Sequence, residues 1–247
     1  MLNISGILGR KMKEDGFTLI EISVVLLISG LLFFTVMKGS SLIEYARLHR
    51  LMQDMRKVWS DVNFFYTEYH YYPGDMPNAS DFFDSNKCGG IRKINGNGDG
   101  RIEFKDRKDG GIESYLAWCH LSQAELGYQS SGGPDSISVV PILGVDIPTS
   151  KIKSSGFFLG YGVHGFEGSN VLVIGAPREN MEKELNVGPI LTAKQAYLID
   201  KKMDDGNPTT GKIRGINTKD SKEPCFIGDA YNIKSKEVNC ALVMELE

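Results

Sequence analysis

A predominantly apolar run near the start of the chain, from Phe17 to Met37, is the feature that most constrains the fold. As an α-helix, its 21 residues extend about 31 Å, which matches the hydrocarbon core of a bilayer. No small-x-small cleavage site follows the run, so we expect it to be retained rather than removed as a secretory signal peptide. The sequence therefore predicts a transmembrane helix over residues 17–37.

Glu21 is the one ionisable residue inside this run. A carboxylate in hydrocarbon is costly unless it is neutralised or paired, which favours a functional role. Glu21 also lies about one helical turn from the start of the run, where its side chain is able to reach the membrane interface. Position alone leaves both interpretations open.

The residues around Glu21 resemble a known motif. The segment from Gly16 to Glu21 reads GFTLIE, basic residues of a polar leader precede it, and the apolar run follows. This pattern is similar to the prepilin signature of type IV pilins and type II secretion pseudopilins. The resemblance covers about residues 10–45 with high specificity.

The resemblance implies how the N-terminus is processed and used. A prepilin peptidase would remove the leader, residues 1–16, by cutting after Gly16, and would N-methylate Phe17. Glu21 would then meet the terminal amine of a neighbouring subunit during filament assembly, where opposite charges attract strongly in a low dielectric. The implied partners are the peptidase, other pilin or pseudopilin subunits, an inner-membrane assembly platform and the lipid bilayer.

The implied location is a single pass through the inner membrane, with the C-terminal domain in the periplasm or in an extracellular filament. Basic residues are more numerous after the run than before it, so the positive-inside rule does not favour a cytoplasmic N-terminus. The expected orientation therefore rests on the resemblance and on the cysteines, which need an oxidising compartment.

Helical periodicity continues beyond the apolar run. We predict one long helix within residues 17–72, with a transmembrane half and an amphipathic half, ended by Pro73 and Gly74. A coiled-coil dimer and packing on the chain's own sheet are both able to bury the apolar stripe, and its width and aromatic content favour the sheet. The stripe comprises Leu48, Leu51, Met55, Val58, Val62, Phe65 and Tyr69.

Residues 73–247 are rich in Gly, Asn, Asp and Pro with short β-prone runs, and we expect them to form a globular extracytoplasmic domain. The predicted class is α+β, similar to the pilin fold, with the long helix packed on a small antiparallel sheet. Thr192 and Gln195 form the pattern of a capping box for a helix through Met203. The other expected elements are a helix over 112–126 and strands over 157–162, 170–174 and 212–216.

The chain has four cysteines and no CxxC spacing, which favours two disulfides over a thiolate metal site. Three pairings are possible. We prefer the nearest-neighbour pairing, Cys88 with Cys119 and Cys225 with Cys240, which staples the loop-rich region.

A segment rich in Asn, Asp and Gly resembles the start of an EF-hand loop, in which alternate oxygen ligands precede a glycine. It predicts a weak, extracellular type of calcium site, with Arg101 offering its backbone carbonyl. An Asn/Gly turn without any ion is the alternative. The predicted ligands are Asn95, Asn97, Asp99, Arg101, Glu103 and Asp106.

The remaining patterns limit the function. A net charge of −3 gives no basic bias for nucleic-acid binding, and no HExxH, GxSxG or P-loop motif is present, so we expect no enzyme. The acidic residues Asp200, Asp204 and Asp205 are interpreted as a solvated face. We expect a minor or specialised structural subunit of a type IV pilus or type II secretion-like filament. The alternative is a membrane-tethered binding protein or adhesin that recognises a ligand through loops around 88–110.

Overall fold

The computed structural model describes most of the chain and divides it into two compact units, Met1–Tyr45 and Ala46–Glu247. Each unit is considered by itself below. Within the first long helix, the side chains of residues 35–41 are not described. The described residues are 16–88, 94–105, 112–133, 136, 139–179, 181, 185–219 and 221–246.

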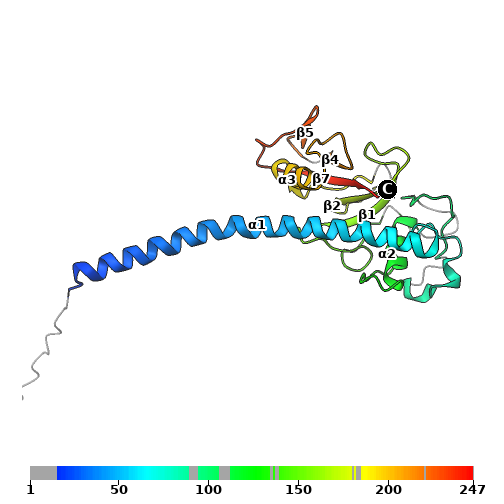
Figure 1. Cartoon of the computed structure of the whole chain (residues 1–247), viewed down its shortest axis with the longest axis horizontal. Helices are drawn as coiled ribbons and strands as arrows, with labels where there is room; N and C mark the ends of the chain where they lie inside the picture. The colour runs from blue at the N-terminus through cyan, green and yellow to red at the C-terminus, as the bar shows by residue number, and fades with distance from the viewer. Residues whose placement is uncertain are drawn as a thin grey trace, which may run out of the picture. The chain divides into compact units, whose positions relative to one another are not determined.

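The long helix α1 begins at Leu19 and ends at Tyr69, which confirms the predicted helix to within a few residues at each end (Figure 1). In the first unit its described apolar side chains are exposed. In the described part of the chain, no helix is both long and apolar enough to cross a membrane. The transmembrane helix predicted over residues 17–37 is thus not found among the described residues.

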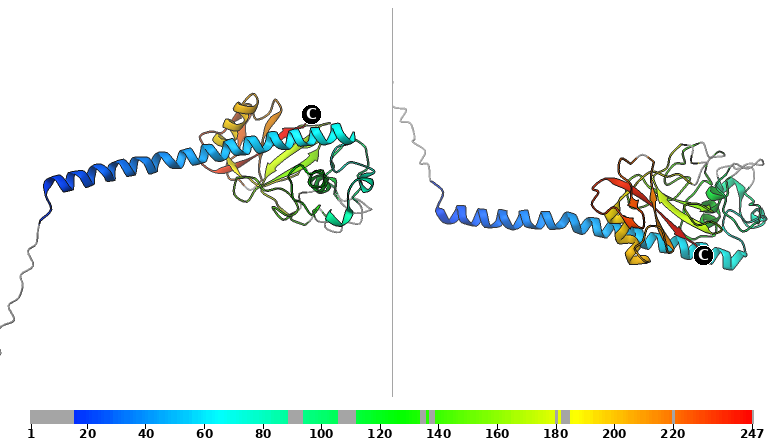
Figure 2. Two further views of the ribbon diagram at one scale, coloured as in Figure 1. Left: turned by 60° about the horizontal axis from the view of Figure 1, so that its bottom comes forward. Right: turned by 90° about the horizontal axis from the view of Figure 1, so that it is seen from above.

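In the second unit, α1 supplies one side of the hydrophobic core. Its apolar stripe is buried together with the inward side chains of the strands, and Asn63 Nδ2 donates to the Leu246 carbonyl at 3.5 Å. Figure 2 shows this part of α1 running alongside the sheet. The prediction that the stripe packs on the chain's own sheet is therefore confirmed. Its fully or nearly fully buried members are Leu48, Leu51, Met55, Val58, Val62 and Phe65.

The sheet of this unit has five antiparallel strands, and its middle strand is the last in sequence. β7 pairs with β2, β3 and β4, while β1 pairs with β2 at the edge. A separate hairpin joins β5, Phe226–Ile227, to β6, Ala230–Tyr231. The sheet strands are β1 Gly156–Tyr161, β2 Asn170–Gly175, β3 Leu191–Thr192, β4 Ile213–Asn217 and β7 Val238–Glu245.

The predicted antiparallel α+β class is confirmed, and β1, β2 and β4 lie within one or two residues of their predicted ranges. Helix α2 spans Glu113–Gln123, and α3 spans Ala193–Met203 with the predicted capping box. Thr192 Oγ1 accepts from the Gln195 N–H at 3.3 Å, and Gln195 Oε1 accepts from the Thr192 N–H at 2.9 Å. Strands β3, β5, β6 and, above all, the central strand β7 were not predicted from the sequence.

The nearest-neighbour disulfide pairing is confirmed. One bond joins Cys88 to Cys119, and the other joins Cys225 to Cys240. The first fastens the short 3-10 helix Ser85–Cys88 to α2, and the second fastens the segment before β5 to the central strand β7. Both bonds therefore connect loop-rich segments to regular elements.

Candidate functional site

The N-terminal end of α1 is closed by a capping box made from Thr18 and Glu21. The Glu21 carboxylate accepts hydrogen bonds from the Thr18 N–H at 2.7 Å and from the Thr18 hydroxyl at 2.8 Å. In return, the Glu21 N–H donates to Thr18 Oγ1 at 3.3 Å. This box satisfies donors that every helix start leaves without a partner. The Thr-x-x-Glu spacing is its sequence signal, which the sequence analysis did not use.

The same geometry leaves part of Glu21 available. Both bonds from Thr18 end on Oε2, and no described residue is bonded to Oε1. Gly16 and Phe17 are exposed, and no atom lies within 4 Å of a Cβ built on Gly16. The Gly16–Phe17 peptide bond therefore joins two exposed residues. The leader residues before Gly16 lie outside the described part of the chain.

The loop from Ile94 to Lys105 is organised around the buried carboxylate of Asp75. Asp75 Oδ1 accepts from the N–H groups of Gly98 at 2.7 Å and Asp99 at 3.1 Å, and Oδ2 accepts from Gly100 at 2.9 Å. Burial raises the pKa of Asp75 to about 6, although these three N–H donors act to lower it. Asp75 is thus a buried acceptor that holds the loop, a role that sequence reasoning did not assign.

Glycine is required at two close backbone contacts, one between this loop and Asp75 and one between Gly74 and α2. A Cβ on Gly96 would lie 2.1 Å from the backbone carbonyl carbon of Asp75. A Cβ on Gly74, which has a φ of 86°, would lie 2.2 Å from the carbonyl oxygen of Glu113. Both positions need close backbone contact that any larger residue would prevent.

Glu113, the first residue of α2, holds the same loop from its other side. Its Oε1 accepts from the Asn97 N–H and its Oε2 accepts from the Glu103 N–H, both at 3.1 Å. Asn170 adds a third support from β2, because its side chain accepts from Ile102 at 2.8 Å and donates to the Gly100 carbonyl at 2.9 Å. The loop is therefore fixed by three buried side chains from separate elements.

The described residues of the predicted calcium site are used differently from the EF-hand template. Asn97 and Asp99 each accept a backbone N–H two residues ahead, and Asn95 accepts from Ser80. Glu103 bonds to Asn97 and Lys105. These side chains of the described part of the loop are thus engaged in hydrogen bonds within the protein. Asp106 lies outside the described residues, and calcium binding by this loop remains a prediction.

Asp200, Asp204 and Asp205 form a different acidic group, in which one carboxylate oxygen from each lies within 4.8 Å of the others. The interpretation as a solvated face is wrong for Asp200, which is fully buried. Its carboxylate accepts from the Tyr231 hydroxyl at 2.7 Å and from the Gly206 N–H at 2.9 Å. Burial raises the pKa of Asp200 to about 6.

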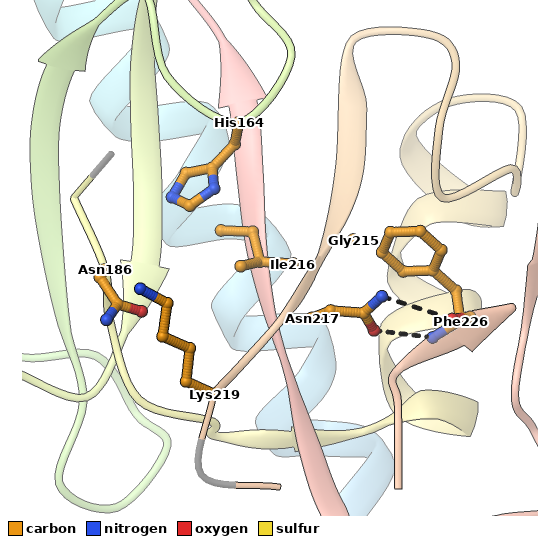
Figure 3. Close-up of a pocket in the computed structure, with 7 residues that line it drawn as sticks. All are labelled: His164, Asn186, Gly215, Ile216, Asn217, Lys219 and Phe226. Atoms are coloured by element: carbon orange, nitrogen blue, oxygen red, sulfur yellow. Dashed lines mark hydrogen bonds between the residues drawn. The ribbon is translucent and has the colours of Figure 1, made fainter. Parts of the chain in front are cut away.

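A polar pocket of about 220 Å³ lies beside β4 (Figure 3). At one edge, the Asn217 side chain exchanges two hydrogen bonds with the backbone of Phe226. His164 and Lys219 also line this pocket, but its described lining contains no Ser, Cys, Asp or Glu that would complete a catalytic pair.

Comparisons of the chain with protein-family models, with curated proteins and with solved structures found no match. The functional interpretation consequently rests on the residues themselves and on their geometry. The two features with a clear physical role are the capped, exposed end of α1 and the loop held by Asp75.

Replacing Asp75 with Asn should destabilise the second unit. An amide has one acceptor oxygen where the carboxylate has two, so at least one of the three loop N–H groups would face an NH₂ group. We expect a loss of about 1–3 kcal/mol in the free energy of unfolding, measured by urea denaturation. The control is Asp99→Asn, which keeps the one oxygen that accepts from Arg101 and should cost less than about 0.5 kcal/mol. Equal losses in the two variants would contradict the role of Asp75.

Asp200 should make stability depend on pH with a defined sign. The pKa of Asp200 in the folded state, about 6, lies above its value near 4 in the unfolded state. Its contribution to the free energy of unfolding is therefore complete below about pH 4 and is lost as the pH rises through about 6. The free energy of unfolding of Asp200→Asn, measured in urea titrations relative to the wild type, should therefore rise by on the order of 2 kcal/mol between pH 4 and pH 7.

Asp205→Asn is the matched control for this titration. Hydrogen bonds from the Thr210 hydroxyl and the Asn207 N–H lower the pKa of Asp205. Its contribution to the free energy of unfolding is therefore lost as the pH falls. The pH dependence of this variant relative to the wild type should have the opposite sign. The same sign in both variants would refute the assignment.

Proposed function

We propose that this chain is a structural subunit of a filament, a minor or specialised pilin or pseudopilin of the type IV pilus or type II secretion kind. The observation that carries the proposal is the exposed, apolar N-terminal part of α1, which follows the GFTLIE segment. Between Leu19 and Phe34 every Leu, Ile, Val and Phe side chain is at least 47% exposed.

These apolar side chains surround the helix. Val24, Val25, Leu26, Leu27 and Ile28 are consecutive, so at 100° per residue they point in all directions around the axis. A helix that is apolar all round needs apolar surroundings on every side. In the proposed cycle, lipid supplies these surroundings before assembly, and the helices of neighbouring subunits supply them in the filament.

Glu21 is the polar group that would distinguish these two surroundings. Its carboxylate caps its own helix through Oε2, and Oε1 is available for a second partner. The amine of a cleaved neighbour, at its Phe17, would supply an opposite charge. In a low dielectric such a pair is favoured far more than at a protein surface, so a subunit gains this interaction only when it joins others.

The disulfides and the accessible cleavage position support the same proposal. Both bonds are expected only in an oxidising compartment, which agrees with a domain exported across the membrane. The exposure of Gly16 and Phe17 suits removal of the leader by a prepilin peptidase. The proposed location is the inner membrane before assembly and the filament afterwards.

Mass spectrometry of the mature protein tests the processing step. The expected N-terminal residue is Phe17 carrying one N-methyl group, because cleavage after Gly16 creates the amine that is methylated. Gly16→Leu should leave the leader attached and should prevent incorporation into filaments. A membrane-associated mature protein that still begins with Met1 would rule out the prepilin interpretation.

A pair of substitutions separates the charge of Glu21 from its capping role. Glu21→Gln keeps an acceptor for the Thr18 N–H but removes the charge, so membrane association should persist while filament incorporation falls at least about tenfold, the effect of about 1.4 kcal/mol. Thr18→Ala removes the hydroxyl of the box but keeps the charge, and incorporation should change much less. Incorporation is measured in sheared filament fractions. The reverse order of effects would assign Glu21 to helix capping alone.

A further inference from the structure

A surface on the second unit combines unpaired basic side chains with exposed aliphatic ones. We name it the basic–aliphatic surface and define it by Arg47, Lys151, Lys153, Val139, Val140, Ile142 and Val145. The exposed fractions of the four aliphatic side chains are 52%, 37%, 61% and 46%, in the order of the chain. Aliphatic residues gathered in one exposed segment indicate an interaction surface more strongly than scattered ones do.

The basic part of this surface surrounds an open hollow of about 430 Å³. Arg47, Lys151 and Lys153 line it together with serine and threonine side chains, and its lining contains no Asp or Glu. All three cations are exposed, and no described residue forms an ion pair with any of them. The hollow therefore presents positive charge and hydroxyl donors, which suit an anionic group such as a phosphate.

The loop that carries the two lysines has a fixed conformation. The Ser150 N–H donates to the Ser155 carbonyl at 2.9 Å, and the Ser155 hydroxyl donates to the Ile152 carbonyl at 2.8 Å. The Ile152 N–H donates to Ser150 Oγ at 3.0 Å, and its side chain packs against the core. With Ile152 held inward, Lys151 and Lys153 on either side of it remain exposed.

The segment that carries the aliphatic part reaches this hollow at Leu143. Leu143 lines the hollow, and a Cβ on Gly144 would lie 3.6 Å from the Thr149 methyl group. The carboxylate of Asp146 is directed inward, because it accepts from the Ile142 N–H at 2.6 Å and from the Ser131 hydroxyl at 2.8 Å. The one acidic side chain of this described turn is thus engaged internally, while Ile142 and Val145 remain exposed.

Chain connectivity limits how far this surface lies from the apolar run. Arg47 follows Met37 by ten residues of α1, which correspond to a helical rise of about 15 Å. The headgroup layer of a bilayer is about 6 Å thick on each side, and electrostatic attraction extends about 8 Å further at physiological salt. Arg47 is therefore able to reach the anionic surface of a membrane that contains the run.

We propose that the basic–aliphatic surface docks the second unit on anionic phospholipid headgroups, with the cations on the phosphates and the aliphatic side chains in the interface. Combined basic and aliphatic contacts are the usual requirements for reversible binding to a membrane surface. The proposal rests on the proposed membrane anchoring of α1. It assigns the unassembled subunit a docked state, which it must leave when it enters a filament.

Hydrogen exchange of the full chain in vesicles tests this proposal. Amides of residues 139–155 should be protected in vesicles of equimolar phosphatidylglycerol and phosphatidylcholine, and should exchange faster in phosphatidylcholine alone. Raising the salt from about 0.1 M to about 1 M should remove the protection, since the screening length falls from about 10 Å to about 3 Å. Protection that is equal in the two lipid compositions would overturn the proposal.

Matched variants identify the side chains responsible. Lys151→Gln with Lys153→Gln should lower the ratio of docked to undocked units by about 30-fold, which is about fivefold for each lysine. Lys194→Gln with Lys236→Gln, which removes two exposed charges elsewhere on the unit, should leave it unchanged. Ile142→Ser with Val145→Ser should weaken docking, and Ile227→Ser with Ile233→Ser should not. Equal effects of the test and control pairs would overturn the proposal.

Two further outcomes separate this proposal from others. Protection that increases with the ratio of protein to lipid would assign the surface to contact between copies of the chain, and would overturn lipid docking. Carbonate extraction measures anchoring independently of docking. A chain that resists extraction but lacks lipid-dependent protection overturns the docking alone, whereas a chain that associates with neither vesicle overturns both the anchoring and the docking.

Discussion

The second unit depends on the burial of one helical stripe in the core that it shares with the sheet. Leu51, Met55, Val62 and Phe65 of α1 are fully buried in the same core as β7, which is paired on both of its edges. Each such side chain contributes about 2 kcal/mol relative to an exposed one. This packing fixes half of α1 in the domain, whereas the apolar half in the first unit is exposed. A single helix thus has one part with intramolecular partners and one part that requires external ones.

Buried carboxylates organise the loops of the domain. Asp75 and Glu113 accept backbone N–H groups from a loop distant from them in sequence, and Asp200 accepts the N–H of Gly206, six residues further along the chain. An ionised carboxylate out of water is costly, and several N–H donors offset much of this cost. The Asn/Gly/Asp loop is consequently held by two negative groups of the protein, Asp75 and Glu113.

Local patterns predicted the helices, the α3 capping box, three strands and the disulfide pairing. They failed for β7, because residues 238–245 form a nearly continuous apolar run with no alternation of polar and apolar residues. Such a run is typical of a strand that is buried on both faces, and it is too short to distinguish from a buried helix by periodicity. The role of Asp75 was also missed, since the N–H groups it accepts from are more than 20 residues away along the chain. Only tertiary structure brings the two together.

The place of β7 in the sheet also has a consequence for the order of events during synthesis. Because β2, β3 and β4 all pair with it, the sheet cannot close until residues 238–245 have left the ribosome. The second disulfide depends on the same strand, since Cys240 lies within it. Contacts of such long sequence separation form slowly. The sheet of the nascent chain therefore stays open until its last strand has been synthesised, although the N-terminal helix is already available.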